Sequence, residues 1–303
     1  MIAPAPVSHS TILGGLSVVP DLDAALAAYR VLGLQLVETA TLSADLTHSW
    51  GAPASTGARY AALRPASGAP CWLRLVEQPA HPAFVPTTTY GWAAFELTVQ
   101  DVFGWPDRLK GSAFEVVGPP RTITGMEPAF IPMQVLGPGR EMLYLNEVLT
   151  DMPRIDLPRA HSPVDRAFIV ILAAADRARA VAWYETALGL ERGDEFTIPY
   201  TMINRAFGLG GDYQTTLTIV QAGRLPVVEI DDYPAAATPR ASHPGMLPPG
   251  NALVTLAVAD LTDCRCDWIA EPATRDGALY EGRRAATTRG VAGELVELVE
   301  VGR

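Results

Sequence analysis

Glu297 is the residue whose position suggests chemistry most directly. It lies in the segment RGVAGELVELVEV, which predicts a glycine-bearing turn followed by a strand whose side chains alternate between two faces. If Leu295 and Val299 face a core, Glu297 lies between them on the same face. A carboxylate in that position is costly unless it binds something. A similar strand, LYLNEV, occurs in the first half of the chain, and there Tyr144 takes the place of Glu297.

Two helices of similar sequence precede these strands. The segments VVPDLDAALAAYRVLGL and AAADRARAVAWYETALGL each place an aspartate, Asp21 or Asp176, where it can cap a helix, and each closes with Leu-Gly-Leu. The strand-like TLTIVQ of the second half also echoes WLRLVE of the first. Several repeats in one order predict four βαβββ modules. Their approximate bounds are 11–80, 90–150, 165–222 and 250–303.

Two proline-rich segments divide these modules. Residues 151–164 predict a linker between an N-terminal domain, 1–150, and a C-terminal domain, 165–303, with two modules each. Residues 223–250 form a second long segment with aromatic, acidic and histidine residues. A loop of that length in a compact domain predicts a lid or a cleft wall.

Composition excludes several classes of function. The chain has 303 residues, a net charge of −10 and no basic cluster, which argues against nucleic acid and anionic membranes as partners. It has no apolar run of the roughly 20 residues that span a bilayer. Three cysteines fit no disulfide framework, and the first residues lack the features of a secretory signal. We therefore expect a cytoplasmic protein.

The repeated motifs resemble the two-domain members of the vicinal oxygen chelate superfamily, which includes glyoxalases, extradiol dioxygenases and the fosfomycin and bleomycin resistance proteins. The resemblance extends from about residue 11 to residue 301 and is carried by the two helix segments and by GELVELVEV. It implies an α+β fold in which the modules pair into two curled mixed-sheet cups, each able to hold a ligand. The superfamily hosts many reactions, so the fold alone does not specify one.

The resemblance also implies metal ligands at two kinds of position, a His on the first strand of a module and a Glu on the last. The corresponding first-strand residues are Gly14, Ala94, Ile169 and Leu253, and the last-strand residues are Arg74, Tyr144, Thr218 and Glu297. Only Glu297 matches. Because a divalent metal needs about three protein ligands, we expect no metal and no cofactor. His48 and His243 are the histidines that could still recruit a metal by swinging inward.

The changed positions suggest a different chemistry in the N-terminal domain. Small residues at its first-strand positions would leave space, and Arg74 and Tyr144 would project into it from facing strands. A guanidinium and a phenol are donors suited to a developing oxyanion. We therefore hypothesise that Arg74 and Tyr144 stabilise an oxyanion while His48 or Glu96 moves a proton.

Further residues are predicted to contact a substrate, and each has a structural alternative. The predicted contacts are Trp50, Trp92, Tyr200, Asn204, Thr218, His243 and Glu297. The tryptophans and Tyr144 could equally be core residues, and His48 could be a surface residue. Arg74 could pair with Glu77 or Glu96 on a solvated face, and Glu297 could hydrogen-bond to Thr218 or Tyr200.

Three functions follow from these observations. The first is a metal-independent lyase, isomerase or hydrolase that acts on a small aromatic or carbonyl compound. The second is a metal-free protein that binds and sequesters a drug-like molecule. The third is a metal-dependent extradiol-type dioxygenase with displaced ligands. Each has a small molecule as its partner, and either a monomer or a homodimer is compatible with four modules.

Overall fold

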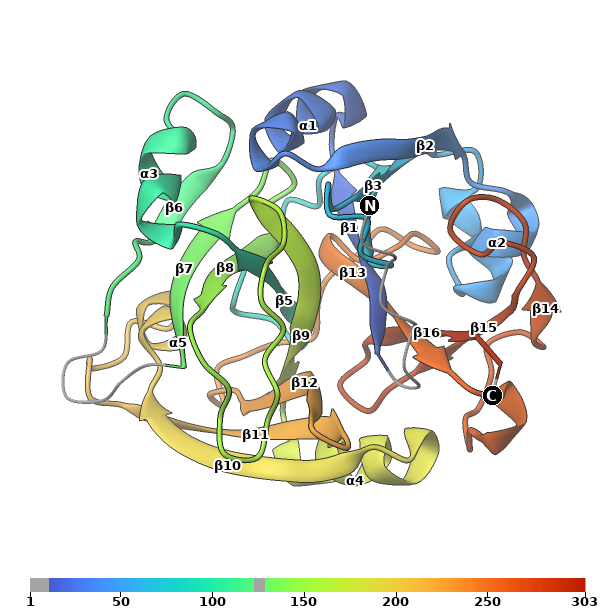
Figure 1. Cartoon of the computed structure of the whole chain (residues 1–303). Helices are drawn as coiled ribbons and strands as arrows, with labels where there is room; N and C mark the ends of the chain where they lie inside the picture. The colour runs from blue at the N-terminus through green and yellow to red at the C-terminus, as the bar shows by residue number, and fades with distance from the viewer. Residues whose placement is uncertain (1–10, 123–128, 303) are drawn as a thin grey trace.

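The computed structural model describes residues 11–122 and 129–302, and its strands form two curled mixed sheets (Figure 1). One sheet contains β1 (Ile12–Val19), β2 (Gln35–Thr41), β3 (Arg59–Arg64), β4 (Trp72–Glu77), β13 (Gly250–Val258), β14 (Ala273–Thr274), β15 (Arg284–Arg289) and β16 (Leu295–Glu300). The other contains β5 (Gly91–Val99), β6 (Glu115–Gly118), β7 (Phe130–Leu136), β8 (Met142–Val148), β9 (Val164–Ala174), β10 (Glu191–Pro199), β11 (Gln214–Ala222) and β12 (Leu225–Asp232). These sheets are called the first cup and the second cup. The predicted α+β fold with paired cups is confirmed.

The modules pair differently from the expectation. The strand order is β14-β15-β16-β13-β1-β4-β3-β2 in the first cup and β10-β11-β12-β9-β5-β8-β7-β6 in the second. The first cup therefore joins the first and fourth modules through β1 and β13, and the second cup joins the second and third through β5 and β9. The expectation that residues 1–150 form one cup is wrong, because each cup takes strands from both halves. The domain boundary at 151–164 stays a prediction.

The helices α1 (Leu22–Tyr29), α3 (Trp105–Arg108) and α4 (Arg177–Leu188) pack on the main core outside the cups. The helices α2 (Ala44–Ser49) and α5 (Thr201–Ala206) pack against the cup interiors. Asp21 and Asp176 accept hydrogen bonds from the backbone N–H groups of Ala24 and Arg179, as predicted for N-caps. The fourth module has only a 3₁₀ turn, Leu261–Asp263, where the others have a helix.

The N-terminal ten residues, whose composition argues against a secretory signal, lie outside the described part of the chain. Within the described part, no helix has the length and apolar character needed to cross a membrane.

The two cups pack against each other through their central strands. A Cβ atom at Gly15 would lie 2.4 Å from the ring of Phe95, so only glycine permits this approach of β1 to the second sheet. The largest apolar core extends from this contact to the inner faces of α1 and α4. The cup interiors are therefore separate from the main core and hold their own side chains.

Two buried tyrosine–glutamate pairs join the modules in a repeated way. The Tyr29 hydroxyl of α1 donates to Glu141 at 2.7 Å, and the Tyr184 hydroxyl of α4 donates to Glu294 at 3.1 Å. Each pair connects the helix of one module with the turn before the last strand of the next module. Burial raises the pKa of each glutamate to about 7.

Candidate functional site

The interior of the first cup is filled by a buried arginine and three aromatic rings. Arg74 of β4 is 2% exposed, and its Cζ atom lies 5.0, 5.6 and 5.3 Å from the ring centres of Trp50, Tyr60 and Tyr280. Its Nε and Nη1 atoms have no hydrogen-bond acceptor among the described residues, so the ring faces take that place. This arginine is enclosed by the protein's own side chains and does not lie on a solvated face.

Glu297 faces the same interior and is fully engaged there. Arg74 Nη2 donates to the Tyr280 hydroxyl at 3.0 Å, which donates to Glu297 Oε1 at 2.9 Å. Trp50 Nε1 donates to the same carboxylate oxygen at 2.9 Å, and the Thr255 hydroxyl donates to Oε2 at 2.7 Å. The prediction that this carboxylate must bind something is confirmed. The partners suggested from sequence, Thr218 and Tyr200, are wrong because both belong to the other cup.

Space was expected beside Gly14, and the structure fills it. A Cβ atom at Gly14 would lie 2.6 Å from the carbonyl oxygen of Trp72 and 2.8 Å from its indole ring. The first cup is thus a closed polar core in which a guanidinium and a carboxylate neutralise each other through a phenol.

The second cup gathers carboxyl groups and phenols. Strand register places Tyr144 of β8 beside Glu96 of β5, and Glu229 of β12 beside β9. The Tyr200 hydroxyl lies 3.2 Å from the Tyr144 hydroxyl and donates to Glu229 Oε1 at 3.1 Å. Asp231 follows two residues later on the same strand, so it shares the inward face.

No basic side chain forms an ion pair with these carboxyl groups among the described residues. Asn146 donates to Glu96 at 2.6 Å, while Glu229 and Asp231 share a hydrogen bond. Burial raises the pKa of Glu229 to about 7, and burial together with the neighbouring Glu229 raises the pKa values of Glu96 and Asp231 well above their usual range. The carboxyl groups of this site therefore favour their protonated forms more than ordinary carboxyl groups do.

A small cavity opens inside the second cup. Its polar wall is formed by Tyr144, Tyr200, Asp231 and Tyr233, and Ala94 forms part of the apolar wall. The volume open to a water-sized group is about 10 Å³, which is room for roughly one such group. The small first-strand residue Ala94 thus borders an open space as predicted.

A much larger cleft, of about 440 Å³, lies outside the cups. Its wall includes Trp50, Tyr90, Pro239, Arg240, Met246, Arg289 and Leu295. The loop 233–249 supplies one side, as expected for a cleft wall, whereas residues 225–232 of the predicted segment form β12. The loop is held in place by Ala54 N–H donating to Gly245 O at 2.8 Å and Leu247 N–H donating to Ser55 Oγ at 3.1 Å.

The charge of this cleft is positive. No Asp or Glu lines it among the described residues, although the chain has 33 acidic and 23 basic residues. Arg240 donates to Thr89 Oγ1 at 3.0 Å and to the carbonyls of Trp92 and Asn251 at 2.8 and 2.7 Å. Burial lowers the pKa of Arg240 to about 10, so it stays cationic at neutral pH.

Arg289 is the exposed cation of the cleft. Its Nη1 atom donates to Gly293 O at 2.9 Å, and neither Arg289 nor Arg240 forms an ion pair with a carboxylate in the described part of the chain. Two guanidinium groups that form no ion pair among the described residues, beside the thioether of Met246, suit a ligand with an anionic group on an apolar body.

The donor sets of the cups do not fit the superfamily's metal. In each module, the residue at the last-strand position lies beside a residue of the first strand. These neighbouring pairs are Leu16 and Arg74, and Thr255 and Glu297, in the first cup, and Glu96 and Tyr144, and Ile171 and Glu229, in the second. A buried guanidinium repels a cation in the first cup. In residues 11–122 and 129–302, no group of three or more His, Cys, Asp or Glu side chains is placed to hold a metal ion.

The structure separates the residues that were predicted to act together. Arg74 lies in the first cup, whereas Tyr144 and Glu96 lie in the second, so the expected oxyanion pair from facing strands is wrong. The reason is the pairing of modules across the two halves of the chain. His48 is exposed on α2, away from both.

The predicted substrate contacts are similarly dispersed. Trp50 and Glu297 belong to the first cup and Tyr200 to the second. Trp92 is a core residue whose Nε1 donates to Leu295 O at 2.8 Å. His243 lies against His81 with ring centres 4.8 Å apart. Their role in binding a ligand stays a prediction.

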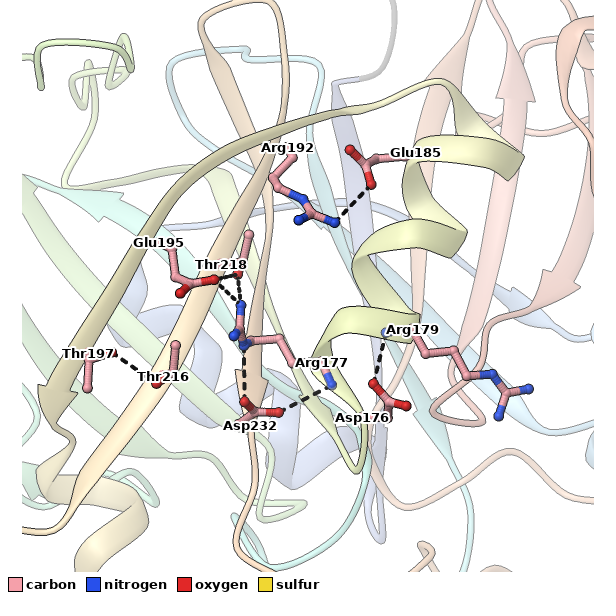
Figure 2. A network of polar contacts seen from close by, with 10 residues as sticks. All are labelled: Asp176, Arg177, Arg179, Glu185, Arg192, Glu195, Thr197, Thr216, Thr218 and Asp232. Atoms are coloured by element: carbon pink, nitrogen blue, oxygen red, sulfur yellow. Dashed lines mark hydrogen bonds and ion pairs between the residues drawn. The ribbon is translucent and has the colours of Figure 1, made fainter.

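Thr218 and Asn204 serve the framework instead. Figure 2 shows Thr218 beside Arg177, which also binds Glu195 at 2.5 Å and Asp232 at 3.1 Å. Asn204 Nδ2 donates to the carbonyl of Tyr213 at 3.0 Å. Thr218 was assigned to a last-strand position, but it lies on β11, and the last strand of the third module is β12. Glu229 takes the position that Thr218 was given.

Sequence reasoning missed several residues of these sites. The segment PVVEIDD was treated as part of a loop, yet its apolar and acidic residues alternate as in GELVELVEV, and this signal could have identified Glu229 and Asp231. Tyr280 and Arg240 lie in irregular segments. No period or motif marks them, and only the fold brings them to their sites.

The chain has the fold of the vicinal oxygen chelate superfamily. Glyoxalase I from Zea mays matches it with a TM-score of 0.61 over 96% of this chain and 92% of that chain, at 17% sequence identity. A putative dioxygenase from Bacillus subtilis matches with a TM-score of 0.58 over 97% of this chain and 86% of that chain, at 12% identity. No protein-family model and no curated protein matches the sequence. At these identities the likeness establishes the fold and no particular activity.

Proposed function

We propose that this protein binds a small organic anion, without a protein-bound metal, in the cleft lined by Trp50, Arg240 and Arg289. The observation that carries the proposal is a cleft of about 440 Å³ that presents two cations and no carboxylate among the described residues. The interior of the first cup is filled, and that of the second has room for about one water-sized group. The cleft is therefore a space in which a drug-sized or aromatic molecule fits.

Binding is better supported than catalysis at this site. Ser242 and Tyr90 line the cleft, but no basic group lies within hydrogen-bonding distance of either hydroxyl among the described residues. The two donors predicted to hold an oxyanion lie in different cups. A sequestering protein needs only affinity, which the cationic and apolar walls provide. We retain the cytoplasm as its proposed location on composition, and a monomer or homodimer as its proposed state.

The proposal is tested by titrating the protein with 1-naphthoate and with its neutral analogue 1-naphthalenemethanol, using calorimetry. The anion is expected to bind more tightly. Arg289→Ala should weaken naphthoate binding about tenfold or more, as expected for a lost charge-assisted hydrogen bond. Prior dialysis against EDTA should leave the affinity unchanged.

Arg179→Ala is the matched control for this substitution. Arg179 is an exposed arginine of α4 whose side chain points away from its neighbours (Figure 2). Its loss changes the net charge by the same amount and leaves the cleft intact. Equal affinity for the two naphthalenes, or equal weakening by both substitutions, contradicts the anionic specificity. The absence of binding by either compound contradicts the proposed function itself.

A further inference from the structure

The second cup contains three carboxyl groups that form no ion pair with any basic side chain in the described part of the chain. Glu96 and Asp231 are buried, Glu229 is half-buried, and their hydrogen-bond partners are an amide, a phenol and each other. Arg240 acts electrostatically on Tyr233 in this region. Its N–H groups donate to the Thr89 hydroxyl and to backbone carbonyls. A buried acidic cluster of this kind is stabilised by protons or by a cation from outside.

The Oδ1 atom of Asp231 favours a cation from outside over protons alone. Asp231 is 1% exposed and lines the small cavity, and its Oδ1 atom has no hydrogen-bond partner among the described residues. Buried acceptors are rarely left in this state, because an unsatisfied polar group costs about 1–3 kcal/mol. The free oxygen therefore indicates a hydrogen-bond donor as the natural occupant of the cavity.

The walls and size of the cavity restrict that donor. Three phenol groups, from Tyr144, Tyr200 and Tyr233, stand around it, and hydroxyls accept hydrogen bonds as readily as they donate them. The volume of about 10 Å³ suits a group of the size of water and excludes a guanidinium.

We propose that the second cup is a binding site for an ammonium ion. An ammonium ion carries hydrogen-bond donors and no acceptor, matches water in size, and supplies the positive charge that the three carboxyl groups lack. Asp231 Oδ1 is its principal acceptor, and the three phenols complete the site. This site shares no lining residue with the cleft, so the inference is independent of the proposed function.

The titratable groups that line the cavity are Tyr144, Tyr200, Asp231 and Tyr233. Glu96, Glu229 and Asp232 act on Asp231 from behind this lining, and Arg240 acts on Tyr233. Because a bound cation favours ionised carboxyl groups, uptake of ammonium should release protons, and calorimetry in buffers of different ionisation enthalpy should detect this release.

Thermal unfolding of the full chain at pH 7.5 tests the site, with ammonium, sodium and tetramethylammonium chlorides at equal ionic strength. Ammonium should raise the Tm in a saturable manner, by about 2–4 °C when the salt is far above its Kd. Sodium and tetramethylammonium should not, since one lacks donors and the other exceeds the cavity.

Asp231→Asn should abolish the saturable shift, and Glu229→Gln provides a second variant if the first does not fold. Asp212→Asn, which removes an exposed carboxylate elsewhere, should retain it. An equal rise of Tm with sodium, no rise with ammonium, or a full rise in Asp231→Asn each overturns the proposal. No rise with ammonium would show that protons alone satisfy the cluster.

Discussion

Arg74 shows how a single residue determines the character of the first cup. At the position where the superfamily resemblance implies a metal-ligating glutamate, the chain places a cation, and the opposite carboxylate, Glu297, becomes its counter-charge. The two are not in direct contact, since Tyr280 relays the hydrogen bond between them. The two charges and the aromatic rings around them therefore form a structural unit in the first cup.

This unit predicts a strong asymmetry between single and double substitution. Arg74→Met should destabilise the protein by about 3–5 kcal/mol, because it leaves Glu297 buried without a cation. The double variant Arg74→Met/Glu297→Leu should recover much of that loss, since apolar replacement of both buried charges is often neutral. Denaturation in urea measures both values. A single variant within about 1 kcal/mol of the wild type would show that Tyr280, Trp50 and Thr255 suffice to hold the carboxylate.

At the scale of elements, the repeated tyrosine–glutamate pairs connect each outer helix with the turn of the following module. The pKa values of Glu141 and Glu294 are raised from about 4.5 in the unfolded chain to about 7 in the folded protein. The folded state therefore binds more protons than the unfolded state between these values, and stability falls as the pH rises through this window. The raised pKa values of the carboxyl groups in the second cup also make stability fall as the pH rises.

We therefore expect the free energy of unfolding to be higher at pH 5 than at pH 7.5, by roughly 3 kcal/mol or more. Glu141→Gln and Glu294→Gln should each reduce this difference by about 2 kcal/mol, because an amide keeps a hydrogen bond and does not titrate. Urea denaturation at the two pH values measures the effect. Glu115→Gln, at an exposed position of β6, is the matched control and should leave the difference unchanged. A free energy of unfolding that increases from pH 5 to pH 7.5 would contradict the raised pKa values of Glu141 and Glu294.

Much of the element pattern was predictable from sequence because it depends on local signals. Aspartate caps, glycine stops and alternating strands mark the modules, and these signals are confirmed at Asp21, Asp176 and β16. The pairing of modules was not predictable, because the first strand of every module offers a similar apolar edge. The candidate site depends on that pairing, which is why Arg74 and Tyr144 were placed together and are found apart.

At the scale of the whole molecule, the pairing across halves makes the two parts of the chain interdependent. The first and last modules share one sheet, so the blue and red strands lie together in Figure 1. The linker 151–164 runs between modules that belong to one cup. Closure of both cups therefore requires strands from residues 1–150 and from residues 165–303.

This interdependence makes a prediction about fragments. Residues 1–150 expressed alone lose the antiparallel partners of both β1 and β5, exposing two apolar central strands as edges. The fragment should therefore self-associate through these edges or fail to fold, and it should not be a folded monomer. Mixing it with residues 151–303 should restore a 1:1 complex with the cooperative unfolding of the full chain. Sedimentation and thermal unfolding measure both outcomes, and a monomeric, cooperatively folded fragment would show that the N-terminal half closes a cup by itself.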